Sequence, residues 1–232
     1  MIMKKILLII VLSSNMLLPI DKVLLEFYAP IATSFTIVNA VENVEAPYDN
    51  STPRLTFEIG AFMNTSMFFK LEPVNVMTGI DIGYYKDVFA YITKLGGRNT
   101  STFDSLLLGI TTKVNYDFLY AGLSIGTKIP LLASTSYGFN LDKFFAHQLD
   151  LRYKNIVVPY IKLSLDFLVI YNVLLGLYLS YDLPVIIDKY TEPDSTLSAI
   201  DVGIQAGVRF TLYNPNNIDD VRIVNRTVEN DK

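Results

Sequence analysis

The chain contains no cysteine and no tryptophan, and its single histidine is His147. The absence of cysteine excludes disulfides, thiolate nucleophiles and cysteine-ligated metals. One histidine and scattered carboxylates form no recognisable zinc or calcium motif. We therefore expect no metal and no cofactor.

Charge is also scarce. Asp, Glu, Lys and Arg make up 18% of the residues, and the formal net charge is −4. No basic stripe of the kind that neutralises phosphates is present. The composition excludes a nucleic-acid-binding protein.

Long apolar runs are missing, because no charge-free run reaches the roughly 20 residues of a membrane-spanning helix. Met1–Lys5 is short and basic, and the apolar run after it is typical of an export signal. A second apolar run, Phe27–Val38, is followed by Ala40 and Ala46, small residues that suit a cleavage point. We predict a signal peptide over residues 1–40, cleaved as late as 46, with an uncleaved anchor as the alternative.

The chain instead places apolar residues at every second position. Ala199–Tyr213 reads AIDVGIQAGVRFTLY, with apolar even positions and polar, charged or glycine positions between them. A period of two predicts a strand. Seven further strands of bilayer-crossing length are predicted: Arg54–Phe62, Val74–Tyr84, Val88–Leu95, Ser105–Tyr116, Phe118–Pro130, Val157–Phe167 and Tyr171–Leu183. The even total suits a closed bacterial barrel.

The predicted connections alternate between short and long. The short joins are Tyr85–Asp87, Asp117 and Leu168–Ile170, and the long ones are Met63–Pro73, Gly96–Asp104, Leu131–Ala146 and Pro184–Ser198. In an outer-membrane barrel the short turns face the periplasm. An aromatic girdle is predicted at that end: Tyr84, Tyr85, Tyr116, Phe118, Tyr120, Phe167, Tyr171, Phe210 and Tyr213.

The segment Leu131–Asn155 has two interpretations. One parity persists from Ala146 to Phe167, which favours a strand that continues past the bilayer and pairs with Leu131–Phe139. The alternative is a short amphipathic helix through Leu141, Phe144, Phe145 and Leu149.

The polar parity indicates a filled interior. Nine of the twelve glycines, at 60, 79, 83, 109, 122, 126, 176, 203 and 207, lie on it, as expected inside a narrow cylinder where space is needed for long side chains. The same parity carries nearly balanced charges, and buried charges must be paired. We predict a salt-bridged plug of Glu58, Asp81, Lys113, Lys128, Lys162, Asp166, Asp182, Asp201 and Arg209.

Three alternatives differ in what the barrel does. A soluble lipocalin-like barrel would turn its apolar face inward around an apolar ligand, but it explains neither the glycines nor the girdle. A porin or small-solute channel needs more strands or a gap in the interior charges. A rim enzyme would use His147 with Ser134 or Ser136 and with Asp142 or Asp150. Because a solvated loop histidine is far more common, we expect no enzyme.

The signal-like N-terminus, the alternating strands and a last strand that ends in GVRFTLY resemble the small outer-membrane β-barrels of the OmpX and OmpA type. The resemblance covers Arg54–Tyr213 and implies an all-β, eight-stranded antiparallel up-and-down transmembrane barrel, monomeric, in the bacterial outer membrane. It implies three kinds of partner: membrane lipid, a surface protein or host partner at the outward loops, and the assembly machinery, which would read Phe210 or Tyr213. Residues 41–53 would form a polar linker, and residues 214–232 a periplasmic tail.

Overall fold

A computed structural model of the protein describes residues 20–39, 54–71, 73–92, 98–137, 140–145, 157–186 and 196–213. Within these ranges, no helix is long and apolar enough to cross a membrane. The strands are β1 (Lys22–Asn39), β2 (Arg54–Leu71), β3 (Val74–Ile92), β4 (Arg98–Tyr116), β5 (Leu119–Tyr137), β6 (Asn140–Phe145), β7 (Val158–Ile170), β8 (Val173–Ile186) and β9 (Thr196–Tyr213).

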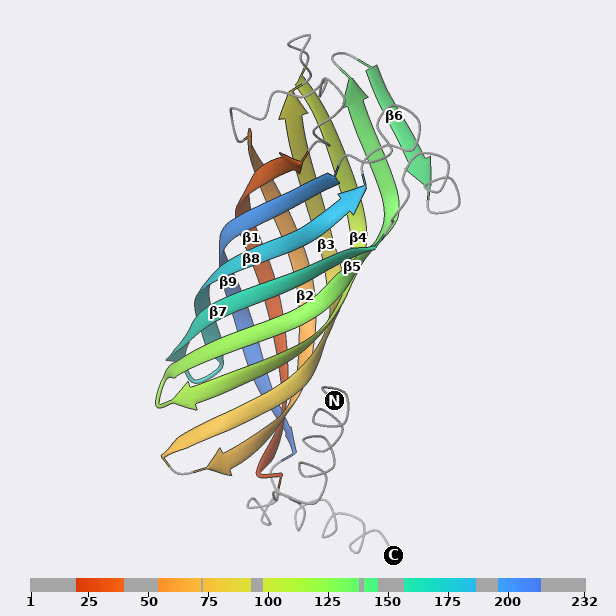
Figure 1. The fold of residues 1–232 in the computed structure, drawn as a ribbon. Coiled ribbons are helices and arrows are strands. Elements are labelled where there is room, and N and C mark those ends of the chain that lie inside the picture. The colour runs from red at the N-terminus through yellow and green to blue at the C-terminus, as the bar shows by residue number, and fades with distance from the viewer. Residues whose placement is uncertain are drawn as a thin grey trace, which may run out of the picture.

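Eight of these strands close into one antiparallel barrel (Figure 1). Each barrel strand pairs with the next along the chain, and β5 pairs directly with β7. The barrel closes between the first and last strands, from Val23 opposite Tyr213 to Asn39 opposite Thr196. β6 pairs with the far end of β5 and is not part of the closed wall. The predicted eight-stranded up-and-down barrel is confirmed.

The strand total of eight nevertheless results from two errors that cancel. The first concerns β1: the predicted signal peptide includes residues 22–39, which lie in the barrel wall between β2 and β9. The alternation in β1 is weak because its inward positions carry small or uncharged residues such as Pro30, Ala32 and Ser34. Glu26 is its one fully buried charge. A chain boundary at residue 40 would therefore separate β1 from the other strands of the barrel.

The second error split β3 in two at Tyr85–Asp87. β3 runs unbroken through this segment, with Tyr85 opposite Ser105 and Asp87 opposite Phe103 on β4. Lys86 breaks the apolar parity because it faces outward, directly opposite Asp104. A charge pair on the outward face imitates a turn in the sequence pattern.

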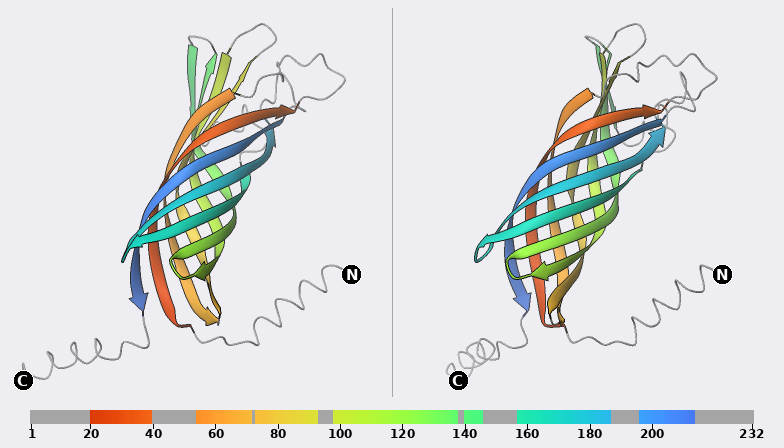
Figure 2. Two further views of the ribbon diagram at one scale, coloured as in Figure 1. Left: turned by 90° about the vertical axis from the view of Figure 1, so that its left-hand side faces the viewer. Right: turned by 60° about the vertical axis from the view of Figure 1, so that its left-hand side comes forward.

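The ends of the barrel differ. Short turns join β2 to β3, β4 to β5 at Asp117–Phe118, and β7 to β8 at Tyr171–Asn172, and all three lie at the end where β1 begins and β9 stops (Figures 1 and 2). Asp117 takes a left-handed backbone conformation with φ 57°, which Asp tolerates in turns. The long loops predicted over Met63–Pro73 and Gly96–Asp104 are wrong, because strands β2 and β4 occupy most of both segments.

At the opposite end, four strands continue past the barrel. Lys86, Asp104, Leu132 and Phe145 form one cross-strand row. Close to this row, the pairing of β2 with β3 stops at Lys86 and that of β7 with β5 stops at Lys128. Beyond it, β3, β4, β5 and β6 form a protruding sheet of residues 86–92, 98–104, 132–137 and 140–145 (Figure 1).

This protruding sheet answers part of the question about Leu131–Asn155. Leu131–Tyr137 extends β5, and its hairpin partner is β6, within which Leu141, Phe144 and Phe145 lie. The amphipathic helix through those three residues is therefore wrong. The predicted continuation of a strand from Ala146 to Lys154 falls outside the described residues.

Closure through β1 makes a prediction about the mature chain. A chain that begins at Val41 lacks β1 and leaves the edges of β2 and β9 unpaired, and each unsatisfied backbone group in lipid costs several kcal/mol. We expect that chain to fail to refold in detergent micelles. A matched chain that begins at Ile20 should refold and show heat-modifiable migration on a gel. Equal refolding of the two chains would show that β1 is dispensable.

Candidate functional site

The outward face of the barrel is apolar along every barrel strand. On β8, for example, Leu175, Leu177 and Leu179 are 46–57% exposed, whereas Gly176, Tyr178 and Ser180 between them are buried. Near the protruding sheet this belt meets an outward-facing charge pair, Lys86 opposite Asp104, and the hydroxyl of Tyr84 donates a hydrogen bond to Asp104. Such a face is stable in hydrocarbon and unstable in water.

It has the architecture of a transmembrane β-barrel. An apolar outer belt around a polar interior is the arrangement of small bacterial outer-membrane barrels. The lipocalin-like alternative is wrong, because it requires the apolar parity to line the interior.

The nine charged residues predicted for the interior are all buried, with exposed fractions of at most 8%. The structure adds two acids to them, Glu26 on β1 and Asp87 on β3, both fully buried. Glu26 lies in the predicted signal peptide and Asp87 in the predicted turn Tyr85–Asp87, so neither belongs to the predicted interior. Parity alone would have found both, since Glu26 shares its face with Ser34 and Thr36, and Asp87 shares its face with Asp81.

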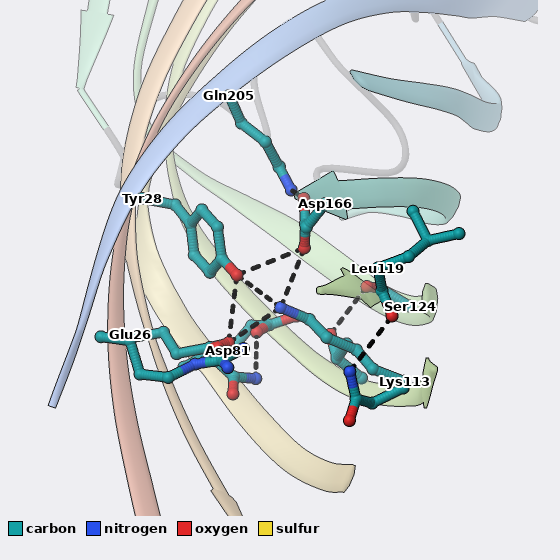
Figure 3. A network of polar contacts seen from close by, with 12 residues as sticks. Glu26, Tyr28, Asp81, Lys113, Leu119, Ser124, Asp166 and Gln205 are labelled. Atoms are coloured by element: carbon teal, nitrogen blue, oxygen red, sulfur yellow. Dashed lines mark hydrogen bonds and ion pairs between the residues drawn. The ribbon is translucent and has the colours of Figure 1, made fainter. Parts of the chain in front are cut away.

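The interior charges form three levels. The lower level, toward the short turns, is a balanced network (Figure 3). Lys113 Nζ lies 2.8 Å from Glu26 Oε2 and 3.0 Å from Asp166 Oδ2. Arg209 Nη2 lies 2.5 Å from Glu26 Oε1, and Gln205 Nε2 donates to Asp166 Oδ1 over 2.5 Å. Two acids meet two bases, and every carboxylate oxygen has a partner.

The middle level is built around Asp81, whose carboxylate accepts hydrogen bonds from Asn64 Nδ2 at 2.7 Å and from the Thr111 hydroxyl. The single base at this level is Lys162, whose Nζ lies 4.2 Å from the centre of the Phe62 ring. A cation over an aromatic face gains electrostatic stabilisation when it is desolvated. Here too, one acid stands against one base.

The upper level, toward the protruding sheet, contains a single base. Lys128 Nζ lies 2.5 Å from Asp87 Oδ1, 2.8 Å from Asp182 Oδ2 and 3.8 Å from Asp201 Oδ2. Glu58 Oε1 accepts a hydrogen bond from the backbone N–H of Val88 at 2.8 Å. All four carboxylates are fully buried.

Tyrosine rings fill the space between these charges, and glycines on facing strands admit them. A Cβ atom at Gly203 would lie 2.5 Å from the Tyr178 ring, and one at Gly207 would lie 2.7 Å from the Tyr28 ring. The cavities beside Lys128 and beside Lys113 are small, each of about 10 Å³. Each has room for about one water molecule.

The predicted aromatic girdle is only partly placed as expected. Tyr85 and Tyr120 are wrong, because both rings point into the barrel and are about 5% exposed. Tyr84 faces outward but lies in mid-strand, far from any short turn. The ring of Phe118 stacks on that of Phe167 beside the turns. Three further members are exposed at the short-turn end: Tyr116, Tyr171 and Phe210. The side chain of Tyr213 is outside the described set.

The catalytic alternative concerns residues at the opposite end. Ser134 and Ser136 lie on β5 in the protruding sheet, and Asp142 lies on β6, opposite Thr135. His147 and Asp150 fall outside the described residues. Over the ranges that the structure describes, no three Asp, Glu, His or Cys side chains are arranged to hold a metal ion.

Comparison with known proteins shows similarity of fold only. No family model and no curated protein matches the chain. Among solved structures, Neisserial surface protein A is 9% identical, covering 79% of this chain and 97% of its own, with a TM-score of 0.42. Ail of Yersinia pestis, solved with the heparin analogue sucrose octasulfate, is 14% identical (80% and 99% covered, TM-score 0.35). Outer membrane protein W of E. coli is 13% identical (80% and 97% covered, TM-score 0.32).

The fit between glycine and tyrosine can be tested at one contact. A Cβ at Gly109 would overlap the hydroxyl of Tyr160, while the next nearest atom lies 3.4 Å away. We expect Gly109→Ala to lower the free energy of unfolding by about 1–3 kcal/mol. Adding Tyr160→Phe should restore most of it, because that hydroxyl has no hydrogen-bond partner to lose. Urea unfolding in micelles measures both changes.

Gly126→Ala is the matched control. A Cβ there would overlap the backbone carbonyl of Leu108 as well as the Tyr160 ring, so Tyr160→Phe should not rescue it. Equal rescue at both glycines would contradict the assigned contact.

Proposed function

We propose that the protein is a monomeric bacterial outer-membrane barrel with a surface-interaction role. Its closed barrel, filled by salt-bridged side chains, anchors the protruding sheet in the membrane. The observation that carries the proposal is the protruding sheet, in which four strands continue past the row of Lys86 and Asp104. An anchor alone has no need of strands beyond the bilayer. Because every barrel strand is paired on both sides, the barrel needs no second copy to satisfy its wall.

The filled interior supports an anchor over a porin or small-solute channel. Charged side chains at three levels contact partners from several strands, and the cavities beside Lys128 and Lys113 each have room for only about one water molecule. A closed eight-stranded barrel is only wide enough to be filled by side chains. Conduction would require these charges to separate within the membrane.

Reconstitution in liposomes tests this point. We expect the purified full chain to produce neither steady conductance nor leakage of a small entrapped dye, because the interior is occupied. A general porin in the same lipids serves as the positive control. Stable single-channel steps that scale with protein amount would establish the channel in place of the plug.

Surface interaction is tested by shortening the protruding sheet. Ala133 and Phe144 face each other across the β5–β6 hairpin, so residues 134–143 can be replaced by Asn-Gly, which favours a two-residue hairpin turn. We expect a non-adherent Gram-negative strain that displays the full chain to attach to epithelial cell layers. The shortened chain should reduce attachment to the level of the empty strain.

The control places Asn-Gly at Tyr171–Asn172, the turn at the opposite end of the barrel. It should leave attachment unchanged, and both variants should keep heat-modifiable migration. Full attachment by the shortened chain, or none by the full chain, would count against the surface role.

A further inference from the structure

The protruding sheet begins at a fork between β2 and β3. The two strands pair as far as Ile59 opposite Lys86. Beyond that point β2 continues beside β1, and β3 continues beside β4 as far as Ile92 opposite Arg98. Among the described strands, β3 therefore has no neighbour on one side over residues 87–92. A sheet edge of this kind presents a row of unpaired backbone N–H and C=O groups.

Side chains take the place of the missing strand at this edge. The backbone groups of Val88 and Ala90 point to the same side, because the two residues are two positions apart. The N–H of Val88 donates to Glu58 Oε1 over 2.8 Å, and its carbonyl accepts from the Thr56 hydroxyl over 2.7 Å. The N–H of Ala90 donates to Thr36 Oγ1 over 3.0 Å. Three successive groups of the edge are thus paired.

The side chains that pair with this edge belong to the closed wall and are buried. Thr36 lies on β1 and Thr56 and Glu58 lie on β2, and all three are at most 6% exposed. Water is therefore largely kept away from these hydrogen bonds. A buried backbone group that loses its partner is left unsatisfied, which is costly. The three bonds link the barrel to the protruding sheet where the β2–β3 ladder has stopped.

We propose that Thr36, Thr56 and Glu58 form a side-chain clamp that replaces the β2–β3 ladder beyond Lys86 and fixes the angle between the protruding sheet and the barrel. Without the clamp, the two parts are joined beside the fork only by the strands that run from one into the other. Such a connection can bend where the pairing of β2 with β3 stops. The clamp is independent of what the sheet binds.

Amide hydrogen exchange, measured by NMR on the refolded full chain in zwitterionic micelles, tests the clamp bond by bond. We expect the amides of Val88 and Ala90 to exchange slowly, although neither has a strand partner on that side. Thr36→Val, which replaces the acceptor hydroxyl by a methyl group, should accelerate exchange at Ala90 about tenfold and change Val88 much less. Glu58→Met should have the reverse effect.

Two further variants serve as controls. Glu58→Gln keeps an acceptor oxygen and should leave the Val88 amide protected. Thr111→Val removes another buried hydroxyl, which contacts Asp81 and Ser124 inside the barrel, and should change neither amide. Heat-modifiable migration confirms that each variant is folded, and Thr36→Val alone decides if Glu58→Met does not fold. Fast exchange at both amides in the wild type, or equal acceleration of the two by Thr36→Val, would overturn the proposal.

Spin labels test whether the clamp fixes the sheet. Because the chain has no cysteine, Thr102→Cys on β4 of the protruding sheet and Val202→Cys on the outward face of β9 can carry the only two labels. We expect a narrow distribution of label distances in the otherwise unchanged chain. Thr36→Val combined with Glu58→Met should broaden it, whereas Thr111→Val should not. An equally narrow distribution in the clamp variant would show that the clamp does not fix the sheet.

Discussion

The structure depends on one constraint: in the hydrocarbon of a membrane, which offers no hydrogen-bond partners, every backbone N–H and C=O group must be paired within the protein. In hydrocarbon a sheet must leave no open edge, so the first and last strands have to meet. Here they meet along nearly their whole length, and β1 thereby becomes as necessary as any other strand. The apolar outward belt follows from the same condition, because the closed wall is surrounded by lipid.

Closure at eight strands sets the width of the interior, and the width sets its chemistry. Several bulky rings lie opposite a glycine on the facing strand, as Tyr178 does at Gly203. Charges in so narrow a space must be neutralised by one another. The lower network achieves this through contacts among Glu26, Lys113 and Arg209. At the upper level, among the described residues, Lys128 is the base that contacts Asp87, Asp182 and Asp201, while Glu58 accepts a hydrogen bond from the backbone of Val88.

Much of the wall was predictable because alternation is a local property. The period of two identified Ser105–Tyr116 and Ala199–Tyr213 as strands and assigned Lys113 and Arg209 to the inside. The prediction failed where the local signal was ambiguous. β1 resembles the apolar part of an export signal because its inward positions are small, and β3 resembles two strands because Lys86 faces outward where the apolar belt ends.

The sequence by itself determined which face of each strand is apolar. The apolar face in turn determines that lipid surrounds the barrel and that its charges point inward. Only the tertiary structure decided which charges meet. Arg209 donates to Glu26 across 183 positions of chain, and Lys128 reaches three acids on three different strands. The parity of a side chain depends on its neighbours in the sequence. The interaction partners of a side chain depend on the register of every strand around the closed wall. The sequence of a single strand does not contain that information.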